Sequence, residues 1–315
     1  MTMFSKSLFP SVNESLEYNA TENITDYNES QNEYAFSGNW LYITSIIALL
    51  ICLPGLVGNG IVIWLLGFRI KRTPFTTYIL NLAIADFSVL SNEFIGDICF
   101  LFGLVPPNII HDYFASAYHA IVLFTFTVSQ YLMTIISIDR CVCLFFPLWH
   151  RCHRPPHLST TVCVVVWILS FLTTAIGVSL HFTGYNIIKF LHFLFNAVVC
   201  MSIMCVSTIA MFLKFCLRSP QKKKGKLLRT IWITLFFFLL LAFPFNITHI
   251  LYLSLLQNDY LYGYGVMCAL LNSAINPMIY YLVGRDKRGR SSKQIKKVFE
   301  KLFKEEEDSR ENEEI

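Results

Sequence analysis

Ionisable residues lie inside or at the ends of long apolar runs in this chain, where their energetic cost is high. Asp86 falls within one such run, and the pair Asp139 and Arg140 closes another, from Tyr113 to Ile138. Charged groups at membrane depth are rare and usually serve an ion pathway, a proton relay or a conformational change. An ion pair at the end of a spanning segment therefore favours a switch over a simple anchor.

Several uncharged polar residues have the spacing needed to join Asp86 in one cluster. Asn272 and Asn276 are one helical turn apart and share a face of a helix. Pro277, which follows them, frees a backbone carbonyl and permits a local bend. Together with Ser129 of another apolar run, these groups suit water or a small cation. Hydrogen bonding that merely holds helices together is an equally good interpretation of the same residues.

The pattern of acids, histidines and cysteines does not indicate catalysis. An intramembrane enzyme needs paired Asp, Ser-His or clustered His residues at bilayer depth, and the sequence contains none. Cys152, His153 and His157 are close in sequence, but a basic loop is a simpler interpretation than a metal site. The cysteines form no extracellular disulfide framework, although Cys99 and Cys268 both approach one surface. We therefore predict a protein without enzymatic activity.

The composition requires lipid as the solvent for much of the chain. Of its 315 residues, 55% are hydrophobic and 15% charged, which is too apolar for a soluble domain of this size. A bilayer is crossed by roughly 20 apolar residues, and seven stretches qualify: Trp40–Phe68, Thr76–Phe102, Tyr113–Ile138, Ser159–Phe182, Ile187–Leu217, Leu227–Leu256 and Leu261–Val283. We predict an all-α bundle of seven transmembrane helices over residues 40–283. A transporter or channel is the alternative, but an odd span number without inverted repeats argues against it.

Basic residues and glycosylation sequons give this bundle a direction. All but two of the 25 Lys and Arg residues, Lys6 and Lys189, lie on one side of the spans, which makes that side cytoplasmic. Residues 1–39 are then extracellular, and their polar, acidic composition predicts a disordered tail. We expect no cleaved signal peptide, because no apolar region precedes the first span. The tail carries four acceptor sequons for glycosylation, at Asn13, Asn19, Asn23 and Asn28.

Together these features resemble the rhodopsin-like G-protein-coupled receptors. The resemblance covers about residues 40–303 and rests on Gly58-Asn59, Asn81-Leu82-Ala83-Ile84-Ala85-Asp86, Asp139-Arg140-Cys141, Trp167, Phe243-Pro244 and Asn276-Pro277-Met278-Ile279-Tyr280. Two loops, residues 68–76 and 147–155, look like those of the Mas-related receptor family. The resemblance implies a plasma-membrane receptor in which an extracellular peptide or small organic ligand shifts the sixth helix and opens a cleft for a heterotrimeric G protein. It implies no nucleic-acid partner.

The resemblance also assigns roles to individual residues. Arg140 would meet the G protein, Leu148 would insert into it, and Phe238 with Pro244 would form the bend of the sixth helix. The full set for coupling and activation is Asp139, Arg140, Leu148, Phe238, Pro244, Asn276, Pro277 and Tyr280. A sodium-and-water site that favours the resting state would consist of Asp86, Ser129, Asn272 and Asn276.

The chain departs from the common receptor pattern on its outer face. Ala115 stands where most receptors carry the disulfide cysteine of the third helix, and the loop from His181 to Asn186 contains no cysteine. Ala242 replaces the tryptophan before the sixth-helix proline, which excludes an aromatic rotamer at that position as the trigger. We expect an open, loosely tethered outer face.

Acids and tyrosines near the outer surface are the candidate ligand contacts. Glu93 and Asp97 are one turn apart and suit a basic peptide or an amine, whereas solvated rim charges are the alternative. The carboxylate that holds biogenic amines is absent, with Val122 in its place. Some Mas-related members bind cations through acids on the fourth and fifth helices; this chain has none there, which argues against a preference for basic ligands. The candidates are Glu93, Asp97, Tyr113, Tyr118, Tyr252 and Tyr264.

The cytoplasmic loops and tail predict contacts with lipid and regulators. The basic loops attract anionic lipid, and apolar and lysine residues alternate at helical spacing over residues 284–304, which predicts an amphipathic helix on the membrane surface. An acidic tail, residues 305–315, follows. Receptor kinases and arrestin are candidate partners through a sparse set of serines: Ser291, Ser292 and Ser309.

The sixth helix offers no acid that could hold Arg140 across the bundle. Its cytoplasmic start contains only basic charges, from Lys222 to Arg229. The remaining restraint is Asp139, interpreted as a partly exposed pair of modest strength. We therefore expect a shallow resting state with appreciable basal signalling.

Overall fold

The computed structural model describes residues 19–70, 72–104, 109–182, 187–217, 225–252 and 258–284. The chain divides into two compact units, Met1–Ser45 and Ile46–Ile315, and the second contains the helical bundle. The predicted surface helix beyond Gly284 and the acidic tail lie outside the described residues. The side chains of several helical residues also lie outside them, among which Tyr113 and Phe238 are candidate site residues.

All regular elements in these ranges are helices. They are α1 (Asn19–Phe68), α2 (Pro74–Leu101), α3 (Ile109–Phe145), the short α4 (Pro147–Cys152), α5 (Leu158–Phe182), α6 (Ile187–Phe195), the π-helix η1 (Asn196–Cys200), α7 (Met201–Leu217), α8 (Gly225–Leu251) and α9 (Asp259–Gly284). Each predicted span coincides with one of these helices, except that the fifth is the succession α6, η1 and α7. The all-α prediction is therefore confirmed.

The first helix begins earlier than the predicted first span. α1 starts at Asn19, whereas the sequence predicted a disordered tail up to residue 39. The segment from Asn19 to Ser37 contains neither Gly nor Pro, so no residue in it interrupts a helix. Three sequon asparagines, Asn19, Asn23 and Asn28, lie on this part of α1, while Asn13 lies outside the described residues. Their glycosylation stays a prediction.

The helices have the length and apolarity of membrane spans. Large apolar side chains such as Leu50 and Val206 are exposed on the helices, as expected where lipid is the solvent. Among the described residues, α8 contributes the shorter apolar segment Leu239–Leu251. Five segments have the full length and apolarity of a span: Asn39–Phe68, Pro74–Leu101, Ser116–Phe145, Leu158–Ser179 and Phe193–Lys214.

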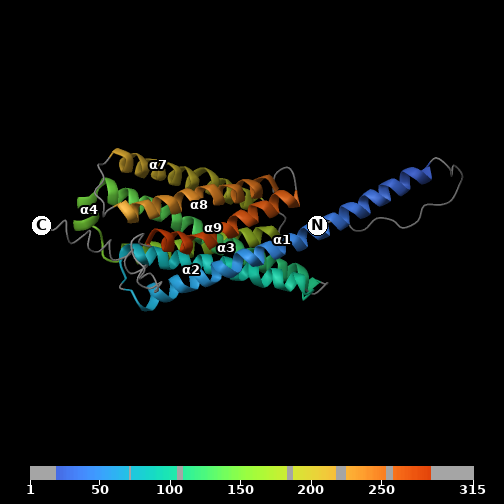
Figure 1. Cartoon of the computed structure of the whole chain (residues 1–315), viewed down its shortest axis with the longest axis horizontal. Coiled ribbons are helices and arrows are strands. Elements are labelled where there is room, and N and C mark those ends of the chain that lie inside the picture. The colour runs from blue at the N-terminus through green and yellow to red at the C-terminus, as the bar shows by residue number, and fades with distance from the viewer. Residues whose placement is uncertain are drawn as a thin grey trace. The chain divides into compact units, whose positions relative to one another are not determined.

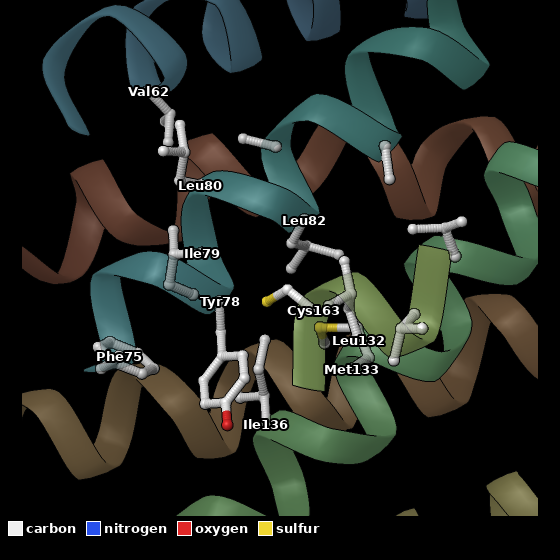
Figure 2. Close-up of a cluster of buried hydrophobic side chains, with 14 of the residues drawn as sticks. Val62, Phe75, Tyr78, Ile79, Leu80, Leu82, Leu132, Met133, Ile136 and Cys163 are labelled. Atoms are coloured by element: carbon white, nitrogen blue, oxygen red, sulfur yellow. The ribbon is translucent and has the colours of Figure 1, made fainter. Parts of the chain in front are cut away.

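The core of the bundle lies between α2, α3 and α5. Within the unit Ile46–Ile315, α2 packs against α3, α5 and α9, α3 also contacts α7, and α8 contacts α7 and α9 (Figure 1). Buried side chains of α2 and α3 point toward one another and toward Cys163 of α5 (Figure 2). The cluster includes Phe75, Tyr78, Ile79, Leu82, Leu132, Met133 and Ile136.

Local sequence signals account for the start of α2 and for irregularities in the longer helices. Thr73 and Thr76 form a reciprocal capping box, and Pro74 occupies the first turn, where it costs no hydrogen bond. Pro244 and Pro277 lie inside α8 and α9, where each removes one helical hydrogen bond. The fifth span has no proline, and its irregularity is η1, which contains the buried Asn196.

Gly55 allows α1 to approach its neighbours closely, and we predict that Gly55→Ala lowers stability. A Cβ at this position would lie 2.7 Å from Leu90 Cδ1 and 2.8 Å from Ala274 Cβ. Overpacking of this kind costs about 1–3 kcal/mol. Gly67→Ala is the matched control, because a Cβ there meets nothing within 4 Å. Thermal unfolding of purified protein should show a lower midpoint for Gly55→Ala alone; equal midpoints for the two variants would contradict the close approach.

Candidate functional site

Asp139 is the centre of a buried charged cluster at the end of α3. Its carboxylate accepts a hydrogen bond from Arg140 Nη2 at 2.5 Å and forms an ion pair with Arg154, whose Nη1 lies 2.8 Å from the other carboxylate oxygen. The side chains of Arg140 and Asp139 are only 5% and 9% exposed. One acid therefore pairs with two guanidinium groups, and the second comes from the segment after α4.

Two further residues complete this cluster. His150 Nε2 lies 3.6 Å from the second carboxylate oxygen of Asp139 and also contacts Arg154 Nη1. The interaction with the Asp139 carboxylate raises the pKa of His150 above its ordinary value. Arg154 Nη2 donates to Ser159 Oγ at 2.7 Å. Arg154 therefore connects the end of α3 to the first turn of α5 and holds α4 between them.

Arg140 is also held from the side of α2. Its guanidinium lies over the ring of Phe75, with 4.3 Å from Cζ to the ring centroid, a favourable cation–π geometry. The interpretation of Asp139 and Arg140 as a partly exposed pair of modest strength is therefore wrong. Residues of α2 and of the segment around α4 bury the pair, whereas the prediction considered only α3 and the sixth helix. The expectation of a shallow resting state therefore has no support from this pair.

The sequence interpretation treated Arg154 and His150 only as part of a basic loop. Pro147 signals the start of a helix, but Arg154 lies beyond the end of α4, so helical spacing does not pair it with His150. The sequence does not show which neighbour either side chain meets.

Exposed apolar side chains lie at the end of α3 and on α4, next to the charged cluster in the sequence. Leu148 is 74% exposed, and Phe145, Phe146 and Trp149 are also exposed. Lys214 of α7 lies over the ring of Phe145 and donates to the Leu144 carbonyl. An apolar surface beside a buried ion pair suits the docking of another macromolecule.

A second polar cluster lies in the middle of the bundle. The fully buried Asp86 carboxylate accepts hydrogen bonds from Ser129 Oγ and from Asn276 Nδ2, both at 2.8 Å. The Ser273 hydroxyl lies near this carboxylate without hydrogen-bond geometry. The structure thus brings Asp86, Ser129 and Asn276 together, from α2, α3 and α9, as the sequence predicted.

Asn272 is one helical turn from Asn276 and is buried. None of the described residues hydrogen-bonds to its side chain. Buried amides are normally satisfied, so the Asn272 side chain leaves hydrogen-bonding capacity that a water molecule or an ion would fill. Carboxylate, hydroxyl and amide oxygens are the ligands of hard cations. The residues therefore fit a sodium ion.

Other motif residues tie helices together. Asn59 Nδ2 donates to the carbonyls of Gly55 and Ser273, both at 3.0 Å, which joins α1 to α9. Trp167 Nε1 donates to Asn81 Oδ1 at 3.1 Å, which joins α5 to α2. These bonds give the motifs of the first, second and fourth spans a structural role.

Known proteins show the same organisation over most of the chain. Residues 58–186 match the sequence profile described as 7 transmembrane receptor (rhodopsin family). The Mas-related G-protein coupled receptor member A8 of Mus musculus is 32% identical over 276 residues, 82% of this chain and 87% of its own. The proto-oncogene Mas of Rattus norvegicus is 34% identical over 263 residues, 80% of this chain and 81% of its own. This chain belongs to the Mas-related G-protein-coupled receptors. Member X2 of Gorilla gorilla gorilla, 32% identical over 281 residues, covers similar shares, 84% and 83%.

The remaining predicted activation residues of this Mas-related receptor lie in α8 and α9. Tyr280 is buried in the core cluster, and Ala242 is also fully buried. Pro244 and Pro277 lie within their helices as predicted, whereas the Phe238 side chain lies outside the described residues. The roles of these residues in helix movement stay predictions.

At the predicted outer end of the receptor, two ligand candidates contact each other. Tyr118 Oη donates to Glu93 Oε2 at 2.5 Å. The ring of Tyr252 instead lies tilted against that of Tyr262, with 5.1 Å between the centroids, and Tyr264 is 56% exposed on α9. The Tyr113 side chain lies outside the described residues.

The structure also bears on the two cysteines near the outer surface. Cys99 and Cys268 are both free thiols, so they do not pair. His249 of α8 lies in an aromatic cluster. Its ring stacks on that of Phe193, with 3.8 Å between the centroids, and lies 5.8 Å from that of His119. His119 was missed by the sequence interpretation, since a single histidine in an apolar run carries no distinguishing pattern.

Proposed function

We propose that this Mas-related receptor binds an extracellular peptide or small organic molecule and activates a heterotrimeric G protein. It does so without enzymatic activity of its own. Its N-terminus is extracellular, and the end of the bundle containing Asp139 faces the cytoplasm, as the distribution of Lys and Arg supports. The plasma membrane is the site at which such a receptor meets its ligand.

The observation that carries this function is the buried ion pair beside an exposed apolar surface. Arg140 is held by Asp139 and Phe75, while Leu148 projects from α4 close by. Release of Arg140 would give a G protein a charged group and an apolar contact on one face. Burial makes intermediate positions of Arg140 unfavourable, because partial release would leave a buried guanidinium without its partners. The held and released states are therefore separate.

The remaining residues supply the movement that releases Arg140. Pro244 and Phe238 form the bend of the sixth helix, and Pro277 permits α9 to rearrange around Asn276 and Tyr280. Bending at helix-interior prolines is physically expected, because the hydrogen bond to the preceding turn is missing. A ligand that binds the bent form better shifts the population toward it.

A sodium ion and water would stabilise the resting form through Asp86, Ser129, Asn272 and Asn276. Asp86 would supply the negative charge, and the other side chains would complete its surroundings with oxygen ligands. Anionic lipid at the basic loops, receptor kinases at tail serines and arrestin are further partners under this proposal.

Nucleotide exchange on a purified G protein tests the function. In lipid nanodiscs, the receptor should accelerate exchange by at least one G-protein class, and Arg140→Ala should reduce the rate to that of the G protein alone. Cys152→Ser is the control, because its exposed side chain lies in the same region outside the charged cluster. Failure with every class, accompanied by measurable solute flux, would favour the transporter or channel interpretation instead.

A further inference from the structure

The last turn of α3 places a thiol against the charged cluster at Asp139. Cys143 follows Asp139 by one helical turn, so the two side chains share one face of α3. The His150 ring of α4 lies over this face, because its Nε2 is 3.6 Å from Asp139 Oδ1 and the same ring is hydrogen-bonded to the Cys143 thiol. Cys143, His150 and Asp139 therefore form a continuous series of thiol, imidazole and carboxylate.

This series suits the transfer of a proton from the thiol to the imidazole. A nucleophile is activated where a base hydrogen-bonds to it and a third group orients that base. Asp139 and, after it, Cys143 raise the pKa of His150 above its ordinary value, so this ring takes up a proton more readily than a free histidine. His150 is also buried, which keeps its orientation fixed. The Cys143 thiol therefore has a base and an orienting acid in place.

The surrounding charges favour the ionised thiol. Two guanidinium groups, from Arg140 and Arg154, pair with the single carboxylate of Asp139. Lys214 of α7 donates to the carbonyl of the residue that follows Cys143. Reactive cysteines lie in electropositive, partly exposed surroundings, and the Cys143 side chain is half-buried. Its position thus combines positive charge with access from outside.

Three other thiols provide comparisons within the same molecule. Cys141 Sγ donates to the Ser207 carbonyl at 3.5 Å and is directed toward α7. Cys152 of α4 and Cys205 of α7 are both exposed. Exposure alone ranks these two above Cys143 in reactivity. The opposite order would therefore report the contacts of Cys143 with the His150 ring and the charges.

The location of Cys143 favours reagents that dissolve in lipid. It lies in the last turn of Ser116–Phe145, the part of α3 that is long and apolar enough to cross a membrane. The exposed apolar side chains of Phe145 and Phe146 follow it. Apolar compounds leave water for such surroundings. A small, apolar electrophile therefore reaches this thiol more readily than a large polar one.

We propose that Cys143 is a covalent modification site for small α,β-unsaturated carbonyl compounds, with His150 as the base and Asp139 as the residue that orients it. In this addition the Cys143 sulfur forms a bond to the β-carbon, and the π electrons of the carbon–carbon double bond move toward the carbonyl. The proton that His150 accepted from the thiol passes to the α-carbon. No group leaves, and no oxidant or cofactor takes part.

The adduct would act on the residue that holds Arg140. It takes the thiol from His150 and adds bulk one turn from Asp139, which weakens the charged cluster. This consequence rests on the receptor function proposed above, under which release of Arg140 raises nucleotide exchange. The modification itself does not depend on that function.

Site-resolved alkylation of the full-length receptor in nanodiscs tests the modification. N-ethylmaleimide is the α,β-unsaturated probe, and N-ethylsuccinimide, which lacks the double bond, is the matched control. Quenched time points are analysed by fragment-ion mass spectrometry, which gives a rate for each cysteine. Cys143 should react faster than Cys152 and Cys205 with the maleimide, and no cysteine should react with the succinimide. A Cys143 rate no higher than that of the two exposed thiols would overturn the site.

A variant of the base tests the cause of the reactivity. His150→Gln keeps a hydrogen-bonding side chain but removes the base. Because a thiol without a base is only a few per cent ionised near pH 7, the rate at Cys143 should fall about tenfold. The rate at Cys152, measured in the same sample, should not change. An unchanged Cys143 rate in folded His150→Gln, checked by its unfolding midpoint, would refute the role of His150.

Nucleotide exchange then tests the consequence separately. N-ethylmaleimide should raise basal exchange by the wild type more than by Cys143→Ser, which lacks the nucleophile. An equal response of the two would refute the effect of the adduct on Arg140. Selective modification of Cys143 in a receptor that promotes exchange on no G protein would support the site and contradict the receptor function.

Discussion

Replacing Asp139 with alanine will destabilise the receptor by about 3–5 kcal/mol, the range measured when one partner of a buried ion pair is removed. The structural reason is that Asp139 pairs with both Arg140 and Arg154 in a site that is largely closed to solvent. Its removal leaves two guanidinium groups without an anion. Thermal unfolding of the purified receptor measures the effect. Because Arg140 is no longer held by a charge, basal nucleotide exchange per folded receptor should rise.

A double-variant cycle identifies the cause of the destabilisation. Arg154→Met in the Asp139→Ala background removes one of the two unbalanced charges, so part of the lost stability should return. Residues in one such network deviate from additivity by about 0.5–3 kcal/mol. Arg154→Met alone should lower stability, because it removes the bond to Ser159 and the connection to α5. Strictly additive effects, or an Asp139→Ala receptor that unfolds like the wild type, would refute a buried three-residue network.

Replacing Asp86 with leucine will produce the second large effect, in the middle of the bundle. The carboxylate is fully buried and accepts bonds from α3 and α9, so leucine leaves Ser129 and Asn276 without their acceptor. Hydrogen bonds to charged groups contribute about 1.5–3 kcal/mol each, whereas interhelical bonds in membranes average about 0.6 kcal/mol. The full burial of Asp86 favours the upper values. We expect a loss of about 3 kcal/mol, measured by thermal unfolding.

Sodium dependence separates an ion site from simple helix attachment at Asp86. Sodium chloride should raise the unfolding midpoint of the wild type more than choline chloride at equal ionic strength. Asp86→Asn keeps the size and one acceptor oxygen but removes the charge, so the difference between the two salts should disappear. Should the difference persist in Asp86→Asn, sodium acts elsewhere. If the wild type shows no difference between the two salts, the cluster only holds the helices together by hydrogen bonds.

The architecture followed from the sequence because lipid imposes a simple rule. Every backbone group inside a bilayer must be satisfied locally, so an apolar run of sufficient length becomes a helix. Six of the seven predicted spans coincide with single helices. The rule says nothing about irregularities, so η1 was not predicted. The rule also does not apply outside the membrane, so it could not predict that α1 extends back to Asn19.

The mid-bundle cluster was predictable, but the cluster at Asp139 was not predictable in full. Asp86, Ser129 and Asn276 are polar residues in apolar runs, where their cost marks them individually. Arg154 and His150 lie in a basic loop, where a charged side chain costs little free energy because it contacts water. Their presence there does not distinguish them from the other basic residues. Their importance arises only when α4 folds against α3 and removes Asp139 from solvent.

The sequence by itself determined the seven-helix fold, the family and the identity of the polar residues inside the membrane, since hydropathy and short motifs are local properties of the chain. The tertiary structure decided which charges meet. Asp139 received a second guanidinium from Arg154, and Glu93 received the phenol of Tyr118 across Gly96. Both contacts join residues far apart in sequence, and their strength depends on burial, which arises only when helices pack. The same physics explains why a pair interpreted from the sequence as partly exposed and of modest strength is buried and tightly held.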